Sequence, residues 1–390
     1  MSDLKKLKIL FFSKFFAEAM FLPFLALYYK SLGFNEAVIG LFLAIPPIAG
    51  ITLTPIYSIL CKNVKVAKII YSIICSIDLV IMFLFFVFTK QNQLLIVVII
   101  YNIFNANNFG MLEGIATVCA ANLKTDYSKV RVYGSFAYAF GLLSSGVLTK
   151  IGSFKIAAYI SALLTLNAII FCILLNVKPK DEVIEKRDIK GFLRNKHYFI
   201  FIIFYTIYIG SMNVGDDFFS TYLAENYNFS FDSYGYLQSL FVIIEGIVVI
   251  LLFSLRKKFK FRHLYICAIS LSIIRFSITT LNAPLPLIII SGLTRGITWG
   301  IHTYLWAQFV INIVGKKNGT LAIMICSLIL NSYQAVMKIV MGRFITNHGY
   351  FLFYLVITYL LIFAFIYFVI VYRKNEYINN NKDTLNLIKR

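Results

Sequence analysis

The chain has 390 residues, of which 60% are hydrophobic and only 14% are charged, and its mean hydropathy is +0.81. This composition excludes a water-soluble globular protein, because a soluble domain of this length needs far more surface charge. A formal net charge of +20 would suit a nucleic-acid-binding protein. The basic residues lie between apolar runs, however, and form no basic face, so we expect no nucleic-acid partner.

Apolar runs recur along the whole chain, and a helix of about 20 such residues crosses a bilayer. We therefore predict an all-α polytopic membrane protein with twelve transmembrane helices. The predicted spans are 8–30, 36–60, 67–88, 93–120, 130–150, 155–177, 198–225, 233–255, 262–281, 285–313, 319–344 and 350–372. The first run has no signal-peptide cleavage site, so we expect it to be retained as a helix.

The longest polar connection covers 178–197 and follows the sixth predicted span. We predict that it is a cytoplasmic linker between two six-helix halves, at 1–177 and 198–372, with a cytoplasmic tail at 373–390. Lysine and arginine concentrate in alternate connections, and the positive-inside rule places these in the cytoplasm together with both termini. The other connections carry only Lys30, Lys90, Lys150 and Lys155. Abundant Ile, Lys and Asn are typical of an AT-rich genome, which favours a bacterial inner membrane.

The two halves contain a weak internal repeat. Residues 24–41 match residues 219–236 at an offset of 195 positions, which places the first predicted span on the seventh. The identical pairs are Phe24 and Phe219, Phe34 and Phe229, and Gly40 and Gly235. Two six-helix halves related by an axis along the membrane normal are typical of the major facilitator architecture, in which the solute site lies near the midplane between the halves.

Charged residues also occur inside the predicted spans, where each costs at least about 2.5 kcal/mol near the bilayer centre. They are Glu18, Asp78, Glu113, Asp216, Asp217, Glu245, Lys14, Arg131, Arg275, Arg295, Lys338 and Arg343. The equal numbers of acids and bases predict ion pairs in a polar cavity. The alternative is a purely structural role, which we favour for Lys14, Asp78 and Arg343. Lys14 and Glu18, four residues apart, can pair on one helix face.

The stretch 113–139 resembles the lactose permease branch of the major facilitator superfamily, which includes phenylpropionate-type and nucleoside-type proton symporters. That branch has a carboxylate 18 residues before an arginine in a D-Y-x-x-x-R-x-x-G-S-like motif. Here Glu113 lies 18 residues before Arg131, and Arg131 lies within the segment DYSKVRVYGS at 126–135. The resemblance implies that both side chains hydrogen-bond the solute and that Tyr138 stacks on it. A carboxylate and a guanidinium suit neighbouring hydroxyls, and a tyrosine suits an apolar ring face. The alternative is a structural ion pair beside a core tyrosine.

The resemblance continues in the second half, where Glu245 and Arg275 match a carboxylate and an arginine of the eighth and ninth spans. GLTRGITWGIHTY at 292–304 is similar to the tenth span, which carries a histidine and a glutamate near the proton site. Arg295 and Thr298 occupy those two positions here. Because the glutamate is missing, its role must move to another acid or be absent.

We expect a proton-coupling charge network in the second half, formed by Asp216, Asp217, Glu245, Arg275 and Arg295. Asp216 and Asp217 are adjacent and share surroundings of low dielectric constant, so one of them could hold a proton near neutral pH. The alternative is that these acids only neutralise the buried arginines and Lys338.

His302 and Asn105 are further candidate solute contacts. His302 lies in an aromatic-rich stretch and could relay a proton or touch the solute, although a satisfied core histidine is the favoured alternative. Asn105 belongs to a group of amides before Glu113, and amides suit hydroxyl-rich solutes or hydrogen bonds between helices. The six cysteines are scattered singly, so we expect neither a metal site nor a disulfide framework. We also expect no cofactor.

These patterns predict a secondary active transporter that moves a small polar or cyclic solute, sugar-like or nucleoside-like, by alternating access with proton symport. The alternatives are a uniporter or a proton-linked exporter and, more remotely, a membrane-embedded enzyme or sensor. The sequence has no GxxxxGK[ST], HExxH or GxSxG motif, so we expect neither ATP-driven transport nor an enzyme. The expected partners are the solute, protons and the lipid bilayer, and one chain with twelve spans should function as a monomer.

Overall fold

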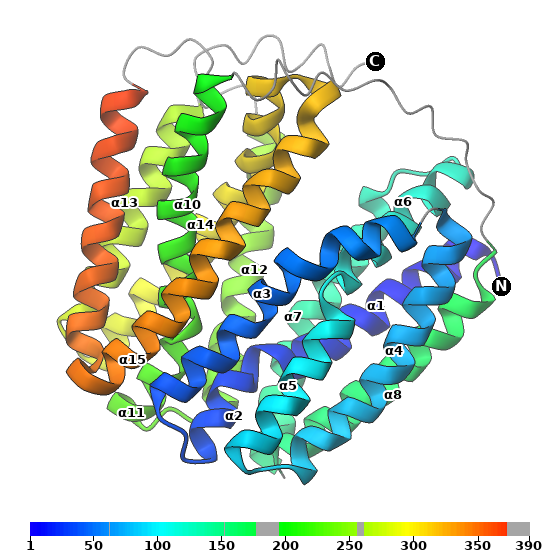
Figure 1. Cartoon of the computed structure of the whole chain (residues 1–390), viewed down its shortest axis with the longest axis horizontal. Helices are drawn as coiled ribbons and strands as arrows, with labels where there is room; N and C mark the ends of the chain where they lie inside the picture. The colour runs from blue at the N-terminus through cyan, green and yellow to red at the C-terminus, as the bar shows by residue number, and fades with distance from the viewer. Residues whose placement is uncertain (62, 152, 177–194, 256–260, 373–390) are drawn as a thin grey trace. The chain divides into compact units, whose positions relative to one another are not determined.

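The computed structural model describes residues 1–61, 63–151, 153–176, 195–255 and 261–372, and its regular elements there are all helices (Figure 1). They are α1 (Asp3–Phe21), η1 (Leu22–Phe24), α2 (Leu25–Ser31), α3 (Glu36–Leu60), α4 (Val64–Val87), α5 (Gln91–Asn105), α6 (Asn108–Asn122), α7 (Ser128–Ile151), α8 (Phe154–Leu174), α10 (Lys196–Asp217), α11 (Phe219–Tyr227), α12 (Phe231–Leu255), α13 (Phe261–Thr280), α14 (Leu285–Val314) and α15 (Lys316–Val371). The predicted all-α class is confirmed. The predicted tail and residues 178–194 of the predicted linker lie outside the described residues.

Ten helical segments of the described chain are long and apolar enough to cross a bilayer, compared with the twelve spans predicted. Two features account for the difference. The last segment, Leu321–Val371, joins two predicted spans across Gly349, whose φ of 76° and ψ of 175° interrupt the helix. Glycine adopts such a positive φ without steric cost. The other feature is α14, which covers a predicted span but is not one of the ten segments. Its 30 residues are long enough to cross a bilayer, but they include many polar side chains.

Three of the predicted spans are broken helices instead of continuous ones. The first divides at η1, where Pro23 has no backbone N–H to donate to the preceding turn. The fourth divides into α5 and α6 at Ala106 and Asn107, within an asparagine-rich stretch. Asparagine side chains compete with the backbone for hydrogen bonds, which weakens a helix at such a point. The seventh divides into α10 and α11 at Phe218, and nothing in the local sequence explains this break.

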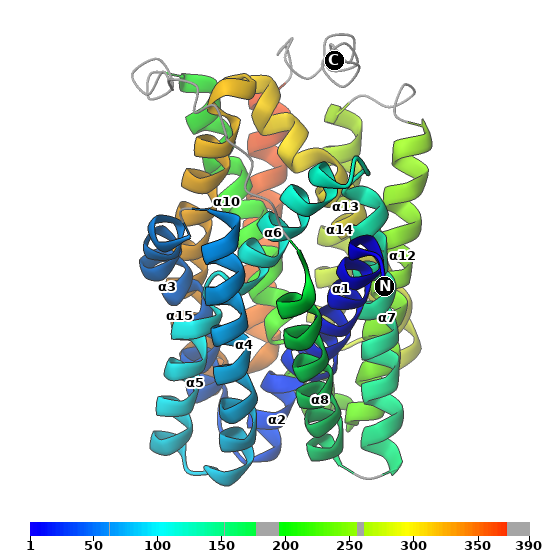
Figure 2. The same ribbon diagram turned by 90° about the vertical axis from the view of Figure 1, so that its right-hand side faces the viewer.

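The described chain forms two compact units. Unit 1 comprises the described residues of Met1–Glu182, Ser220–Ser239 and Lys338–Arg343, and unit 2 comprises those of Val183–Phe219, Leu240–Met337 and Phe344–Arg390. In unit 1, α1 packs along α7 and α8, and α4 packs against α5, α6 and α8 (Figure 2). In unit 2, α13 packs along α14. The domain boundary predicted at 178–197 stays a prediction.

Two close helix contacts in unit 1 involve the glycines of the internal repeat. A Cβ atom added to Gly342 on α15 would lie 3.0 Å from the Cα atom of Gly40 on α3. A Cβ atom added to Gly235 on α12 would lie 2.8 Å from the Cα atom of Gly146 on α7. Gly40 and Gly235 are an identical pair in the repeat, so both copies use this position for close backbone packing. Small residues at such positions let membrane helices approach closely.

Glycines spaced four residues apart also bring α14 against α12 in unit 2. A Cβ atom at Gly296 would lie 2.5 Å from the backbone oxygen of Phe241, and one at Gly300 would lie 2.8 Å from the Cβ atom of Val248. Gly292 meets the Phe241 ring in the same way, at 3.0 Å. This small-residue face fixes the position of α14, which carries several of the predicted site residues.

We expect Gly296→Leu to destabilise the protein strongly, because a side chain there meets backbone and cannot be accommodated without separating α12 from α14. Overpacking a filled interior typically costs about 1–3 kcal/mol. Gly246→Leu is the matched control, since a Cβ atom at Gly246 meets nothing within 4 Å. Thermal unfolding in detergent, monitored by size-exclusion chromatography, should show a lower melting temperature for Gly296→Leu and an unchanged one for Gly246→Leu. Equal melting temperatures would contradict the packing argument.

Candidate functional site

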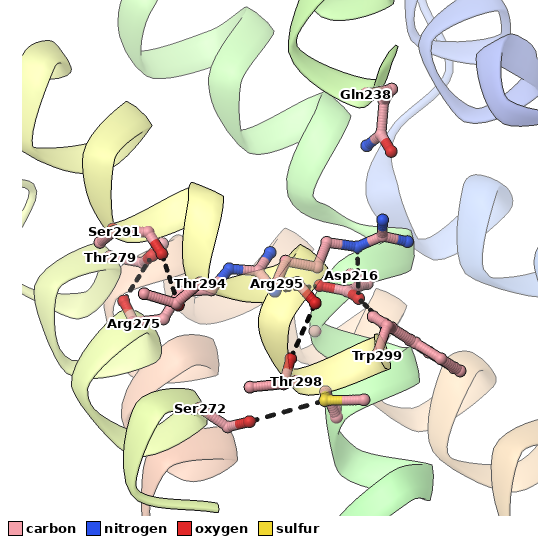
Figure 3. Close-up of polar contacts among 12 residues, drawn as sticks. Asp216, Gln238, Ser272, Arg275, Thr279, Ser291, Thr294, Arg295, Thr298 and Trp299 are labelled. Atoms are coloured by element: carbon pink, nitrogen blue, oxygen red, sulfur yellow. Dashed lines mark hydrogen bonds and ion pairs between the residues drawn. The ribbon is translucent and has the colours of Figure 1, made fainter. Parts of the chain in front are cut away.

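Asp216, the penultimate residue of α10, is the centre of a charge cluster in unit 2 (Figure 3). Its Oδ1 lies 2.6 Å from Nη1 of Arg275 on α13. Its Oδ2 accepts hydrogen bonds from Nε of Arg295 at 2.8 Å and from Nε1 of Trp299 at 3.1 Å, both on α14. One carboxylate therefore joins three helices, through an ion pair to α13 and through two hydrogen bonds from α14. Hydrogen bonds to an ionised group are stronger than bonds between neutral groups.

Arg275 is the most deeply buried member of this cluster, with a side chain that is 2% exposed. Its guanidinium carbon lies 4.9 Å from the ring centroid of Phe219 and 4.7 Å from that of Phe276. Among the described residues, its Nε and Nη2 atoms have no hydrogen-bond partner. The two ring faces stabilise the cation in part, and Asp216 supplies the neutralising charge.

The structure brings together three of the five residues predicted for the charge network, namely Asp216, Arg275 and Arg295. Asp217 is adjacent on α10 and half-buried, while Glu245 on α12 accepts a hydrogen bond from Thr303 at 3.4 Å. Sequence reasoning missed the bond from Trp299 to Asp216. The position of Trp299 four residues after Arg295 could have indicated this bond, because residues four apart share one face of a helix.

His302, predicted as a solute contact, lies in a buried aromatic group on α10 and α14. Its Nε2 is 3.4 Å from the hydroxyl of Tyr205. Its ring lies between Trp299, edge-on at 5.2 Å, and Trp306, stacked at 6.3 Å. The Nδ1 atom is buried and has no hydrogen-bond partner among the residues that the structure describes. The packing favours the core-histidine alternative, and solute contact by His302 stays a prediction.

The predicted pair of Glu113 and Arg131 forms in unit 1, between α6 and α7. Oε1 of Glu113 lies 3.2 Å from Nε of Arg131, and the side chains are 45% and 39% exposed. The guanidinium also lies over the ring of Phe15 on α1, 4.5 Å from its centroid. Such an exposed pair contributes little to stability, typically about 0–1 kcal/mol. Both groups are therefore open to a further hydrogen-bonding partner.

Tyr138 and Asn105, the other residues predicted to contact the solute in unit 1, are partly engaged by the protein. Tyr138 lies on α7, two turns beyond Arg131 and hence on the same helix face. It is half-buried and packs against the hydrophobic core of the unit. Asn105, at the end of α5, donates a hydrogen bond from Nδ2 to Oδ1 of Asp78. Its amide therefore serves a contact between helices, the alternative that the sequence left open.

Among the described residues, no three His, Cys, Asp or Glu side chains form a group that could hold a metal ion. The chemistry available at these sites is hydrogen bonding and charge pairing by carboxylate, guanidinium and indole groups. A bundle of helices that are long and apolar enough to cross a bilayer defines a multi-pass membrane protein. The model of the MFS_1 like family matches residues 4–356, and the chain belongs to this family.

Named relatives agree with this assignment. The chain is 22% identical over 293 residues to the "Probable 3-phenylpropionic acid transporter" of Escherichia coli (strain K12), covering 72% of this chain and 75% of the relative. It is 26% identical over 152 residues to the "Sucrose permease" of Escherichia coli, covering 35% of each chain. The crystal structure of the nucleoside transporter NupG matches with a TM-score of 0.81 at 18% identity, covering 96% of this chain and 100% of that one. The resemblance and the fold class predicted from the sequence are both confirmed.

Proposed function

We propose that this protein is a secondary active transporter that moves a small organic solute, sugar-like or nucleoside-like, across a bacterial inner membrane by alternating access with proton symport. The observation that carries the proposal is the ion pair of Glu113 and Arg131, which forms in unit 1 and stays partly exposed. Membership of the MFS_1 like family supports the transport activity. The concentration of basic residues in alternate connections supports cytoplasmic termini. We expect the chain to act as a monomer without enzymatic activity.

The chemistry of the pair favours a ring that carries polar groups. A carboxylate accepts and a guanidinium donates, so together they match neighbouring hydroxyls on a sugar or a ribose. Tyr138, two turns further along α7, would contact the apolar face of the ring. The relatives named above are described as a probable 3-phenylpropionic acid transporter, a sucrose permease and a nucleoside transporter. An aryl carboxylate is the second candidate class, because Arg131 can also bind a carboxylate.

Asp216 is better suited to a fixed negative charge than to carrying the coupled proton. It receives donors from two arginines and an indole, and each of these stabilises the ionised carboxylate. Thr298, where the resemblance implies a glutamate, is buried and its hydroxyl donates to the backbone oxygen of Arg295 at 2.9 Å. A threonine hydroxyl neither ionises nor binds an extra proton near neutral pH, so it cannot replace a glutamate as a proton carrier. Proton symport therefore requires an acid outside this cluster, with Asp217 and Glu245 as the remaining predicted members.

Uptake by proteoliposomes containing the purified protein tests the proposed activity. We expect one class among labelled glycosides, nucleosides and aryl carboxylates to enter faster than into protein-free liposomes, and unlabelled solute of that class to compete. Saturable uptake of glycosides or nucleosides supports the proposal. Uptake restricted to aryl carboxylates supports transport but replaces the sugar-like or nucleoside-like assignment. A lack of uptake of all three classes would overturn the assignment of the solute.

A further inference from the structure

A second cluster of charged residues lies inside unit 1 and takes no part in the proposed solute site. Lys14 and Glu18 lie on α1, and Asp78 lies on α4. The Nζ atom of Lys14 is 3.1 Å from Oε1 of Glu18 and 3.7 Å from Oδ2 of Asp78. All three side chains are at most 4% exposed. Water therefore contributes almost nothing to their solvation, and the charges must balance locally.

The charges in this cluster do not balance. One ammonium group faces two carboxylates, so full ionisation would leave a net negative charge in a buried membrane-spanning region. Isolated charges of this kind are very unfavourable, and a buried group usually neutralises by gaining a proton. The two carboxylates together must therefore hold one proton, or one carboxylate must hold another cation.

Hydrogen bonding identifies which carboxylate is ionised. Both oxygens of Asp78 face donors: Oδ1 accepts from Nδ2 of Asn105, and Oδ2 accepts from Nδ2 of Asn108 at 3.2 Å. Asn108 also donates to Oδ1 of Asn105 at 2.8 Å, which orients the two amides. Together with the ammonium of Lys14, these contacts surround Asp78 with donors and stabilise its charged form.

Glu18 has the opposite surroundings. Its Oε1 faces Lys14, but its Oε2 is buried and has no hydrogen-bond partner within the described residues. An ionised carboxylate with one bare oxygen away from water is unfavourable, whereas a protonated carboxyl group needs no donor at that atom. Of the two acids, Glu18 is therefore the one whose neutral form fits its surroundings.

Besides Lys14, the titratable groups that interact with these two acids in the described part of the chain include Tyr71 and Cys75 on α4, Tyr101 on α5 and Tyr57 on α3. None of these four is a base that would take the proton near neutral pH. Near this part of α1, α8 provides Ser161, which donates to the backbone oxygen of Ala17, and α7 provides Gly141 beside Ala19. The nearby phenols and thiol are neutral near pH 7, so the balance rests on Lys14, Glu18 and Asp78.

We propose that Glu18 binds an exchangeable proton on Oε2, and that the cluster of Lys14, Glu18 and Asp78 is a proton-binding site in the N-terminal half of the chain. The proton comes from water and returns to water, with no other change of bonding. The site itself stands on charge and geometry, while its use in solute symport rests on the proposed function. This position differs from the predicted network around Asp216.

Infrared spectroscopy of the purified full-length protein tests the site without any solute. We expect a carbonyl band of a protonated carboxylic acid that shifts in D2O. The band should shift again when the protein is labelled with carboxyl-13C glutamate, and it should not respond to labelled aspartate. It should disappear in Glu18→Gln and persist in the matched control Glu113→Gln. Labelling of the unmodified protein keeps the test valid even if a variant folds poorly.

Three results would overturn the proposal: no such band in the unmodified protein, a band that responds only to labelled aspartate, or a band that survives Glu18→Gln in folded protein. The second result would place the proton on Asp78. Because the spectrum needs no solute, a missing band is distinct from a failure of the proposed transport activity. Uptake of solute without this band would remove Glu18 from the coupling mechanism and leave the transporter assignment intact.

Discussion

Asp216→Asn is expected to destabilise the protein by about 3–5 kcal/mol, the usual cost of removing one partner from a buried ion pair. The physical reason is that Arg275, whose side chain is 2% exposed, loses the carboxylate that pairs with it and keeps its charge. Arg275→Met should cost less, because Asp216 then retains the bonds from Arg295 and Trp299. Melting temperatures of the two purified variants in detergent show which of them loses more stability.

The double variant Asp216→Asn with Arg275→Met provides the control. It removes both buried charges, so it should recover a large part of the stability that Asp216→Asn loses. Recovery would show that the loss arises from an uncompensated arginine and not from the changed shape at residue 216. An Asp216→Asn variant that melts at the same temperature as the unmodified protein would contradict the structural role of this cluster.

Glu113→Gln and Arg131→Gln are each expected to reduce solute uptake by about ten- to a hundredfold, while stability changes little. A hydrogen bond to a charged group contributes about 1.5–3 kcal/mol, which corresponds to this range. The small effect on folding follows from the exposure of the pair, because exposed ion pairs contribute about 0–1 kcal/mol. Initial uptake rates in proteoliposomes and melting temperatures of the same preparations separate the two effects.

Asp126→Asn is the matched control for these variants. It also neutralises an acid near α7, but the Asp126 side chain is 77% exposed and its partner Lys129 is 68% exposed. We expect unchanged uptake for this variant. A Glu113→Gln protein that melts much earlier yet transports normally per folded molecule would assign the pair a structural role, and Glu113 would no longer be a candidate solute ligand.

The sequence predicted contacts well where the partners are separated by a regular helix or by one short connection. Lys14 and Glu18 pair as their spacing of four residues predicts. Glu113 and Arg131 pair across the connection between α6 and α7, as their positions near the ends of consecutive spans predict. Gly349 falls where the sequence places a boundary between two spans. Local periodicity is enough for such contacts.

Contacts between helices that are distant along the chain could not be predicted in this way. Asp78 joins Lys14 and Asn105 only because α4 packs near α1 and α5, and the hydropathy pattern does not specify how each helix is rotated. Asn105 was therefore predicted as a solute ligand, although its amide binds Asp78. The same limit applies to Asp216, whose three partners lie on two other helices.

Solute-induced proton movement in proteoliposomes tests the central claim most directly. The protein is reconstituted with a pH-sensitive dye in the external medium, and the solute identified by the uptake assay is added without a pre-formed gradient. We predict external alkalinisation that depends on the solute and disappears when a protonophore is present. Solute flux with no change in external pH would contradict proton symport and identify a uniporter, and acidification of the medium would indicate exchange in the opposite direction.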